Sequence, residues 1–206
     1  MRLRDGMKAV VAALMIAAVS VPAGGETIIH KSVTYFSIGG HTASDLDSEM
    51  MRRGPVSRNT GRRHPGATQI KFNGSATFVA KGNRCEIGGA EVTLSTKLIL
   101  PRWTNRRRAG RDLGLIWDTL AADIKRHEER HAEIARTHAR QLERTILALP
   151  PARDCATLKA RVSRVSNDAM TAHDKDQTRF DRIESVNFEN RMIRLLKYRI
   201  SRKSNQ

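Results

Sequence analysis

A long stretch with helical periodicity in the second half of the sequence constrains the fold more than any other feature. From Asp112 onward, apolar residues recur every three to four positions, which places them on one face of an α-helix. The stretch ends at Pro150 and Pro151, because proline cannot continue a helix. The apolar positions are Leu113, Trp117, Leu120, Ile124, Ile134, Leu142, Ile146 and Leu149. His127 and His131 share this face, so we predict a long helix with two histidines that face the protein interior.

The residues before this helix predict a small sheet and one short helix. Runs of β-branched and aromatic residues, bounded by turn residues, are typical of strands. We expect strands within 26–38, 67–72, 75–80 and 90–100, with a turn at Gly82 and Asn83. Thr42 or Ser44 can cap a short helix that runs through Arg53, with Leu46, Met50 and Met51 on its inner side.

The residues after the proline pair predict a second helix and a basic tail. Asp154 can cap a helix that ends at about residue 171 and runs antiparallel to the first. Residues 187–206 place apolar side chains among Arg and Lys, as in an amphipathic helix. We therefore expect an α+β fold, in which a small, mostly antiparallel sheet packs on two antiparallel helices. One domain spans 24–186, and the tail follows it.

The N-terminus predicts export. Arg2, Arg4 and Lys8 precede an apolar run of 9–21, and Ala23 closes a small-residue cleavage site. Residues 1–23 are thus expected to be a signal peptide, which places the protein in the periplasm or outside the cell. In such an oxidising compartment, Cys85 and Cys155 are expected to form a disulfide. Two buried free thiols are the alternative if the protein is not exported.

The charge of the chain favours an anionic partner. The formal net charge is +16, which attracts lipid headgroups, envelope polymers or nucleic acid. Aromatic residues make up only 4% of the chain and are not interleaved with the basic clusters, so no stacking platform for bases is visible. We expect no specific nucleic-acid binding, and a basic tail that can contact an anionic envelope surface.

The residues His127-Glu128-Glu129-Arg130-His131 form an HExxH motif on the long helix. Side chains four residues apart lie above one another on a helix, so two imidazoles can reach one Zn²⁺ ion. Glu128 lies beside them and can act as a general base on water at the metal. The motif predicts a zinc-dependent peptidase that acts on a protein or peptide substrate. The alternative is a pair of hydrogen-bonded core histidines.

A catalytic zinc site needs a third protein ligand. His138 and Glu143 lie too far along the helix axis to join His127 and His131. The segment 173–178 clusters His and Asp after the second helix, and we select Asp174 as the ligand, with His173 and Asp176 as alternatives. The other interpretation of this segment is a polar loop at a helix end.

Several motifs resemble the predicted secreted zinc-dependent proteases, a domain-of-unknown-function family of the HExxH zincin clan. They are Tyr35, Gly40, Thr42, Gly54-Pro55, Cys85, Leu100-Pro101-Arg102-Trp103, Trp117, HEERH at 127–131, and Cys155. The resemblance implies a zincin-like fold and peptidase activity.

The segment that ends in Thr178 resembles the family's last motif, Asp-x-x-Thr-x-His-Gly, but Phe180 and Asp181 stand where His and Gly would follow. If that histidine is the family's third ligand, either a neighbouring Asp or His replaces it here or the metal site is degenerate. A degenerate site leaves a second hypothesis, a non-catalytic binding or scaffold protein of the envelope.

Overall fold

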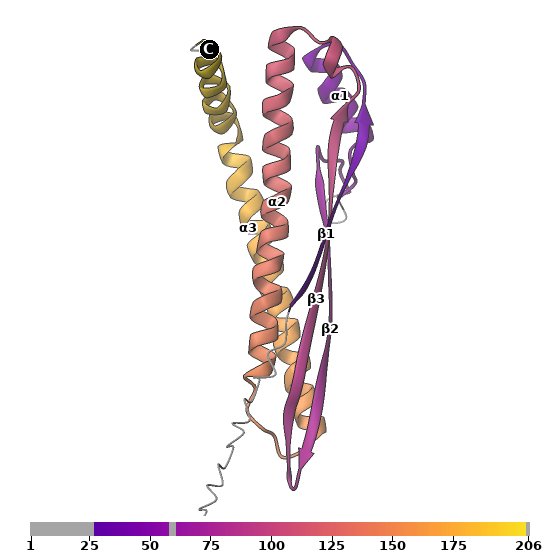
Figure 1. Cartoon of the computed structure of the whole chain (residues 1–206), viewed down its shortest axis with the longest axis vertical. Helices are drawn as coiled ribbons and strands as arrows, with labels where there is room; N and C mark the ends of the chain where they lie inside the picture. The colour runs from indigo at the N-terminus through magenta and orange to yellow at the C-terminus, as the bar shows by residue number, and fades with distance from the viewer. Residues whose placement is uncertain (1–26, 58–60, 205–206) are drawn as a thin grey trace, which may run out of the picture.

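The computed structural model describes residues 27–57 and 61–204, and it shows an α+β protein with two layers. The predicted signal peptide, 1–23, lies outside the described residues. One layer is a three-stranded sheet, and the other holds two long helices on one face of it (Figure 1). The elements in chain order are β1 (Ile28–Ile38), α1 (Ala43–Arg53), β2 (Ala67–Lys81), β3 (Arg84–Trp103), η1 (Arg106–Arg108), α2 (Arg111–Leu147) and α3 (Cys155–Ser204).

The sheet is mixed, with β3 in the middle and the order β1-β3-β2. The β2–β3 pair is an antiparallel hairpin, and its turn lies at the predicted place, where Gly82 adopts a φ of 57°. The β1–β3 pair is parallel, so the expected antiparallel pairing holds only for half of the sheet. β1 and β3 run the same way because the chain passes through α1 and β2 between them.

β2 is one strand, where the sequence predicted two. Its ladder to β3 continues through Asn73 and Gly74, which pair with Thr93 and Val92. Every second residue of β3 from Ala90 to Leu100 is buried, as expected for a strand with one face on a helical layer. The sheet therefore buries a single face against α2.

Helix α1 begins as the sequence predicts, with Thr42 as its N-cap. Asp45 N–H donates to Thr42 Oγ1 at 3.1 Å, and Thr42 N–H donates to the Asp45 carboxylate at 3.0 Å. This reciprocal capping box satisfies two backbone donors at the start of the helix. Leu46 and Met50 are buried as expected. Met51 is 55% exposed, because it lies about 100° further round the helix than Met50.

Helix α2 contributes to two apolar clusters. Near its start, Trp117 packs edge-to-face on Trp103 of β3 with ring centroids 5.7 Å apart. Further along, Ala135, Ala139, Leu142 and Ile146 pack between the sheet and α3. The first cluster fixes α2 on the sheet, and the second also fixes α3 on α2.

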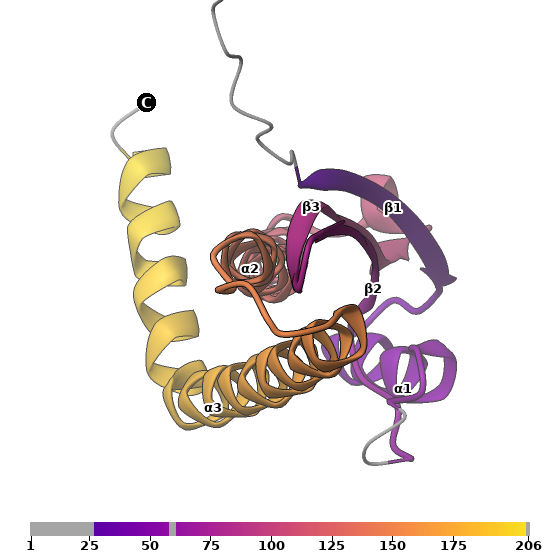
Figure 2. The same cartoon turned by 90° about the horizontal axis from the view of Figure 1, so that it is seen from below.

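Helix α3 continues for 50 residues without a break, which corrects three predictions. The second helix does not end at residue 171, the segment 173–178 is not a loop, and the tail from residue 187 is not a separate helix. No proline or glycine occurs between residues 155 and 204 to stop the helix. Figure 2 shows that α3 curves, so that its C-terminal part extends away from the sheet.

The disulfide between Cys85 and Cys155 is present, as the sequence predicts. It joins the start of β3 to the start of α3. Beside it, Cys85 and Ala152 exchange two backbone hydrogen bonds of 2.8 and 2.9 Å. This end of α3 is therefore fixed to the sheet both covalently and by backbone pairing. Among the described residues, no helix combines the length and apolar character needed to cross a membrane.

Candidate metal centre

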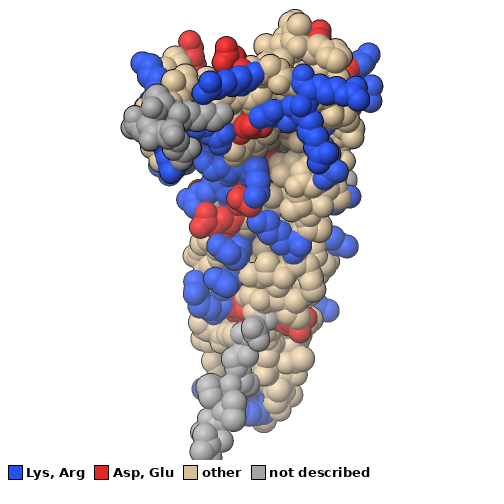
Figure 3. All heavy atoms as spheres, turned by 45° about the horizontal axis from the view of Figure 1, so that its top comes forward, with Lys and Arg blue, Asp and Glu red and all other residues tan. Residues whose placement is uncertain are grey.

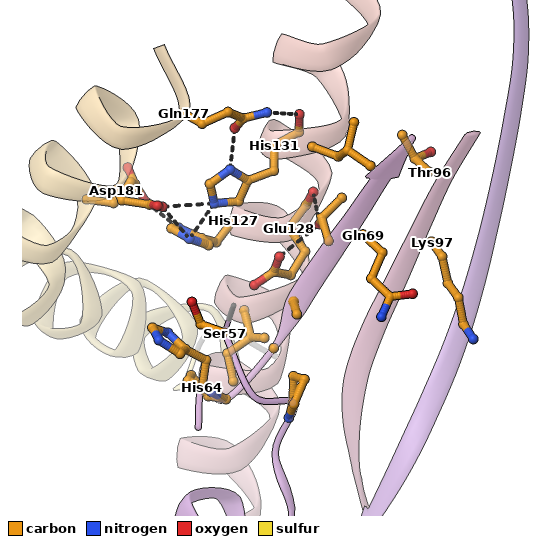
Figure 4. Close-up of a pocket in the computed structure, with 18 of the residues that line it drawn as sticks. Ser57, His64, Gln69, Thr96, Lys97, His127, Glu128, His131, Gln177 and Asp181 are labelled. Carbon is orange, nitrogen blue, oxygen red and sulfur yellow. Dashed lines mark hydrogen bonds and ion pairs between the residues drawn. The ribbon is translucent and has the colours of Figure 1, made fainter. Parts of the chain in front are cut away.

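His127 and His131 lie one turn apart on α2, and their rings meet at one point (Figure 4). Their Nε2 atoms are 3.0 Å apart. Asp181 of α3 places Oδ1 2.9 Å from His131 Nε2 and 3.3 Å from His127 Nε2. These three atoms come from the two helices and form the one group of three such donors within 4.8 Å found in residues 27–57 and 61–204.

The geometry of this group fits a zinc ion. Zn–N and Zn–O bonds of about 2.0–2.1 Å in a tetrahedral site separate the ligand atoms by about 3.3 Å. The three observed separations are 2.9, 3.0 and 3.3 Å. Two imidazoles and one carboxylate are also the ligand set of many catalytic zinc sites, which keep a fourth position for water. His127, His131 and Asp181 are thus the residues that would hold the metal.

The structure brings Asp181, not Asp174, to the two histidines. The two aspartates lie on the same face of α3, because seven residues are close to two full turns, but they are about 10 Å apart along the axis. The Asp174 side chain is 80% exposed and accepts a hydrogen bond from His173 Nδ1 at 3.0 Å. The aspartate that meets the histidines therefore lies on the face of Asp174, but two turns further along the helix.

The other candidates for a third ligand also lie outside the group. Asp176 pairs with His138 Nε2 at 2.9 Å. His173 is buried, and its ring packs edge-to-face on Phe72 of β2. Glu143 is buried near the far end of α2 and accepts a hydrogen bond from Thr27. As expected, neither His138 nor Glu143 reaches His127 and His131.

Gln177 fixes the orientation of His131, a contact that the sequence pattern did not predict. Its side-chain NH₂ donates to the backbone carbonyl of His131 at 3.1 Å, so its Oε1 must face His131 Nδ1. Oε1 can only accept, so Nδ1 of His131 carries the proton. When the ring is neutral, its lone pair is then on Nε2, the atom directed at His127 and Asp181; when the ring is protonated, Nε2 donates a hydrogen bond to Asp181. In metal sites, a hydrogen bond to the ring nitrogen that does not bind the metal orients the histidine in this way.

The same amide connects His131 to His173. Gln177 Nε2 lies 2.9 Å from His173 Nε2, which accepts because His173 Nδ1 donates to Asp174. Burial lowers the pKa of His173, more than the neighbouring Asp174 raises it, so the neutral ring is favoured. Asp174 therefore acts on the group indirectly, through His173 and Gln177.

The face of His127 is covered by Phe180. The two rings are stacked, with centroids 4.9 Å apart and planes 29° apart, and Phe180 also meets His131 edge-on at 5.1 Å. Burial opposes protonation of His131, but hydrogen bonds with Asp181 and Gln177 raise its pKa. Burial likewise opposes ionisation of Asp181, but hydrogen bonds from both histidines lower the pKa of this carboxyl. The carboxylate is thus ionised, as a metal ligand must be.

Glu128 is 5% exposed and faces the first strand positions of β2. Thr68 donates its hydroxyl proton towards Glu128, with Oγ1 at 2.8 Å from Oε2 and 2.9 Å from the backbone oxygen. Burial raises the pKa of Glu128, although Thr68 and the two histidines oppose the shift. A more basic carboxylate beside the histidines suits a general base. A Cβ at Gly66 would lie 2.9 Å from Glu128 Oε1, so the close approach requires glycine.

A charge network lies next to the histidines towards the start of α2. Arg191 donates to both oxygens of buried Asp123, at 2.9 and 3.1 Å, and also pairs with Glu184 at 3.2 Å. Arg126 contacts the same two carboxylates. Glu184 lies 3.7 Å from His127 Nδ1, on the side of the ring opposite Asp181. The tail residue Arg191 is therefore connected to the histidines through Glu184.

These groups line a cleft of about 1520 Å³ between the sheet, the segments 55–57 and 64–66, α2 and α3. His127, Glu128 and His131 form one wall, and Gln177, Asp181 and Phe188 come from α3. Ser57 and His64 lie in the same cleft, and both side chains are labelled in Figure 4. The cleft is large enough for several residues of an extended peptide beside the candidate metal centre.

The fold and the site define an α+β protein with a His-His-Asp candidate metal centre in an open cleft. The chain belongs to a family described as bacterial proteins of unknown function (DUF922), whose sequence profile matches residues 33–188. That range covers both histidines, Glu128 and Asp181. No curated protein and no solved structure matches the chain.

Proposed function

We propose that the protein is a zinc-dependent peptidase that cleaves peptide bonds with an activated water. The single observation that carries the proposal is the convergence of His127, His131 and Asp181 beside buried Glu128 in an open cleft. A zinc ion held by these three ligands would supply a water of lowered pKa and polarise the scissile carbonyl.

The protein's own residues then have separate roles. Glu128 accepts the proton of the attacking water and returns it to the leaving amine, a role its raised pKa favours. Thr68 holds Oε2 of Glu128. Gln177 keeps His131 in the tautomer that presents Nε2. Phe180 shields one face of the His127 imidazole from water.

The wider proposal includes a zincin-like fold and export by a signal peptide at 1–23. The HExxH motif on a long helix beside a sheet supports the first, and the basic and apolar N-terminus supports the second. A second candidate function is a non-catalytic binding protein with the same zinc site. It is favoured by Phe180, which stands where the resemblance places a histidine and which stacks on His127.

The test compares two neighbouring glutamates. Purified protein lacking residues 1–23 is loaded with zinc, and its zinc content and casein cleavage are measured. Glu128→Gln should keep the zinc and lose roughly 10²- to 10⁴-fold in rate. Glu129→Gln is the matched control, since Glu129 is half-exposed and pairs with Lys31, and it should cleave at the rate of the wild type.

Three results separate the alternatives. Equal cleavage by Glu128→Gln and wild type would reject the mechanism. Zinc bound at one equivalent, lost in His131→Ala, but with no cleavage of casein or of a peptide library, would favour the binding protein. No zinc in folded wild type after exposure to excess metal would reject both, and would leave hydrogen-bonded core histidines.

A further inference from the structure

The C-terminal part of α3 exposes apolar side chains in a row. Val186, Ile193 and Ile200 are spaced by seven residues, close to two turns, so they lie along one side of the helix. They are 77%, 44% and 55% exposed. Met192, Leu195 and Leu196 of the same segment are half-buried. The segment therefore presents its more exposed apolar row, Val186, Ile193 and Ile200, to solvent.

The same segment is strongly basic. Between residues 186 and 204 the sequence has six Lys or Arg and one acidic residue, Glu189. Arg194 and Lys197 are exposed, one and four positions after Ile193, so Lys197 lies on the same side as the apolar row. In the part of the chain that the structure describes, no carboxylate lies within ion-pair distance of either of them.

A second group of cations lies at the same end of the molecule. The ion pair between Arg191 of α3 and Asp123 of α2 shows that these two residues lie at the same height along the antiparallel helices. From it, α2 extends about 18 Å back to Arg111, and α3 about 20 Å forward to Ser204. Exposed Arg107 and Arg108 precede Arg111 and therefore lie at the same end of the molecule as the C-terminal part of α3. Figure 3 shows Lys and Arg crowded at this end.

We propose that this end of the protein docks on the surface of an anionic lipid bilayer. The docking surface consists of Val186, Ile193 and Ile200 with the adjacent cations Arg194 and Lys197 of α3, while Arg202, on the other side of the helix, and Arg107, Arg108 and Arg111 add positive charge at the same end of the molecule. Cations attract the negatively charged surface, and the apolar row enters the boundary between headgroups and acyl chains.

Other occupants fit less well. A soluble polyanion would use the cations but gain nothing from exposed valine and isoleucine. Nucleic acid would need aromatic stacking, but Phe188 and Tyr198 are each covered by an arginine, Arg191 and Arg202, at 5.8 and 5.9 Å. A second copy of the chain would bring like charges together. The combination of positive charge with an exposed apolar row therefore favours a lipid surface over these three partners.

The experiment is flotation of the protein lacking residues 1–23 with vesicles. One set contains phosphatidylcholine alone, and the other contains one-third phosphatidylglycerol. Wild type should float with the anionic set only, and less so at high salt. The triple variant Arg194→Gln, Lys197→Gln, Arg202→Gln should bind on the order of 100-fold more weakly, given the effect of each cation near an anionic surface.

A matched control separates local from overall charge. The triple variant Arg140→Gln, Lys159→Gln, Arg164→Gln removes the same charge from exposed positions far from the docking surface, and it should bind as wild type. Equal losses in the two triple variants would overturn the proposal, because only the total charge would then matter. All variants are checked for folding by circular dichroism.

A second variant tests the lipid specifically. Val186→Ser with Ile193→Ser keeps every charge, and it should bind anionic vesicles at least several-fold more weakly while retaining any affinity for single-stranded DNA of mixed sequence. Unchanged vesicle binding by this variant would overturn the proposal in favour of a soluble polyanion. Equal flotation of wild type with neutral vesicles would overturn it as well. None of these results depends on zinc or on peptidase activity.

Discussion

The contact between α2 and α3 has two halves of opposite character. From the histidines towards the C-terminal end of α2, Ala135, Ala139 and Leu142 pack with Val162 and Val165 of α3 in an apolar cluster. From the histidines towards the start of α2, the contact consists of ion pairs and hydrogen bonds among half-buried and buried groups. The apolar half stabilises the helix pair without demanding a precise geometry, since burial is non-directional.

The polar half does demand a precise geometry. Asp123 is 4% exposed and Glu128 5% exposed, and burying such charges is favourable only if each finds partners. Arg191, Arg126 and Thr68 supply them. The comparison shows that the apolar half holds α3 in place, while the polar half fixes the positions of Asp181 and Gln177 against the histidines. Three substitutions test this division.

The largest effect is expected in the apolar half. Ala139 is fully buried between the sheet and α3, so Ala139→Glu would bury an unpaired carboxylate. The free energy of unfolding, measured by urea denaturation, should fall by about 4 kcal/mol or more. Arg140→Glu is the control, because Arg140 is exposed, and it should stay within about 0.5 kcal/mol. Equal stabilities would contradict the stabilising role of the apolar half.

A smaller effect is expected from Gln177 in the polar half. Gln177→Leu keeps the size of the side chain but removes the acceptor at His131 Nδ1. Zinc affinity, measured by competition with a chelating dye, should fall roughly 10- to 100-fold with little loss of stability. Gln177→Glu keeps an acceptor there and should recover most of the affinity. If Gln177→Leu and Gln177→Glu bind zinc equally, the amide does not orient the histidine.

The smallest effect concerns pH. Burial opposes ionisation of Asp123, but hydrogen bonds from Arg191 and Arg126 lower its pKa below 3.8. Its stabilising contribution is therefore full above pH 3.8 and is lost as the pH falls through the lower folded pKa, with a slope of at most about 1.4 kcal/mol per pH unit.

The comparison with Asp123→Asn isolates this contribution. The difference in unfolding free energy between wild type and this variant should be constant at neutral pH and should shrink below about pH 4. Asp168→Asn, at an exposed position of α3, serves as the control. A difference that grows on acidification would mean that folding raises the pKa of Asp123 instead of lowering it.

Local signals in the sequence predicted the elements that local interactions form. The cap at Thr42, the turn at Gly82 and the long helix with HExxH were expected and are present. The disulfide was expected from the pairing of two cysteines. The parallel pairing of β1 with β3 was not, because the partner of a strand is set by contacts far apart in the chain.

The candidate site was predicted in part. The two histidines and Glu128 carry a local motif, whereas Gln177 and Asp181 lie beyond residue 171, where the second helix was expected to end. Their side chains bond to α2, a tertiary contact that local patterns do not record. A signal was nevertheless present, since no proline or glycine interrupts residues 155–204 and positions 174, 177 and 181 follow a helical spacing. The zinc ion and the peptidase activity remain predictions.

Because the disulfide fixes the start of α3, a small tilt of the helix at that point becomes a larger displacement further along it. Cys155 is tied to β3, and Asp181 lies 26 residues further along, about 39 Å from that fixed point. A tilt of about 3° at the disulfide would displace Asp181 by about 2 Å, enough to carry its carboxylate out of reach of the two imidazoles. The covalent link thus fixes only the far end of the helix, and the contacts with α2 on both sides of Asp181 supply the precision with which the carboxylate is presented.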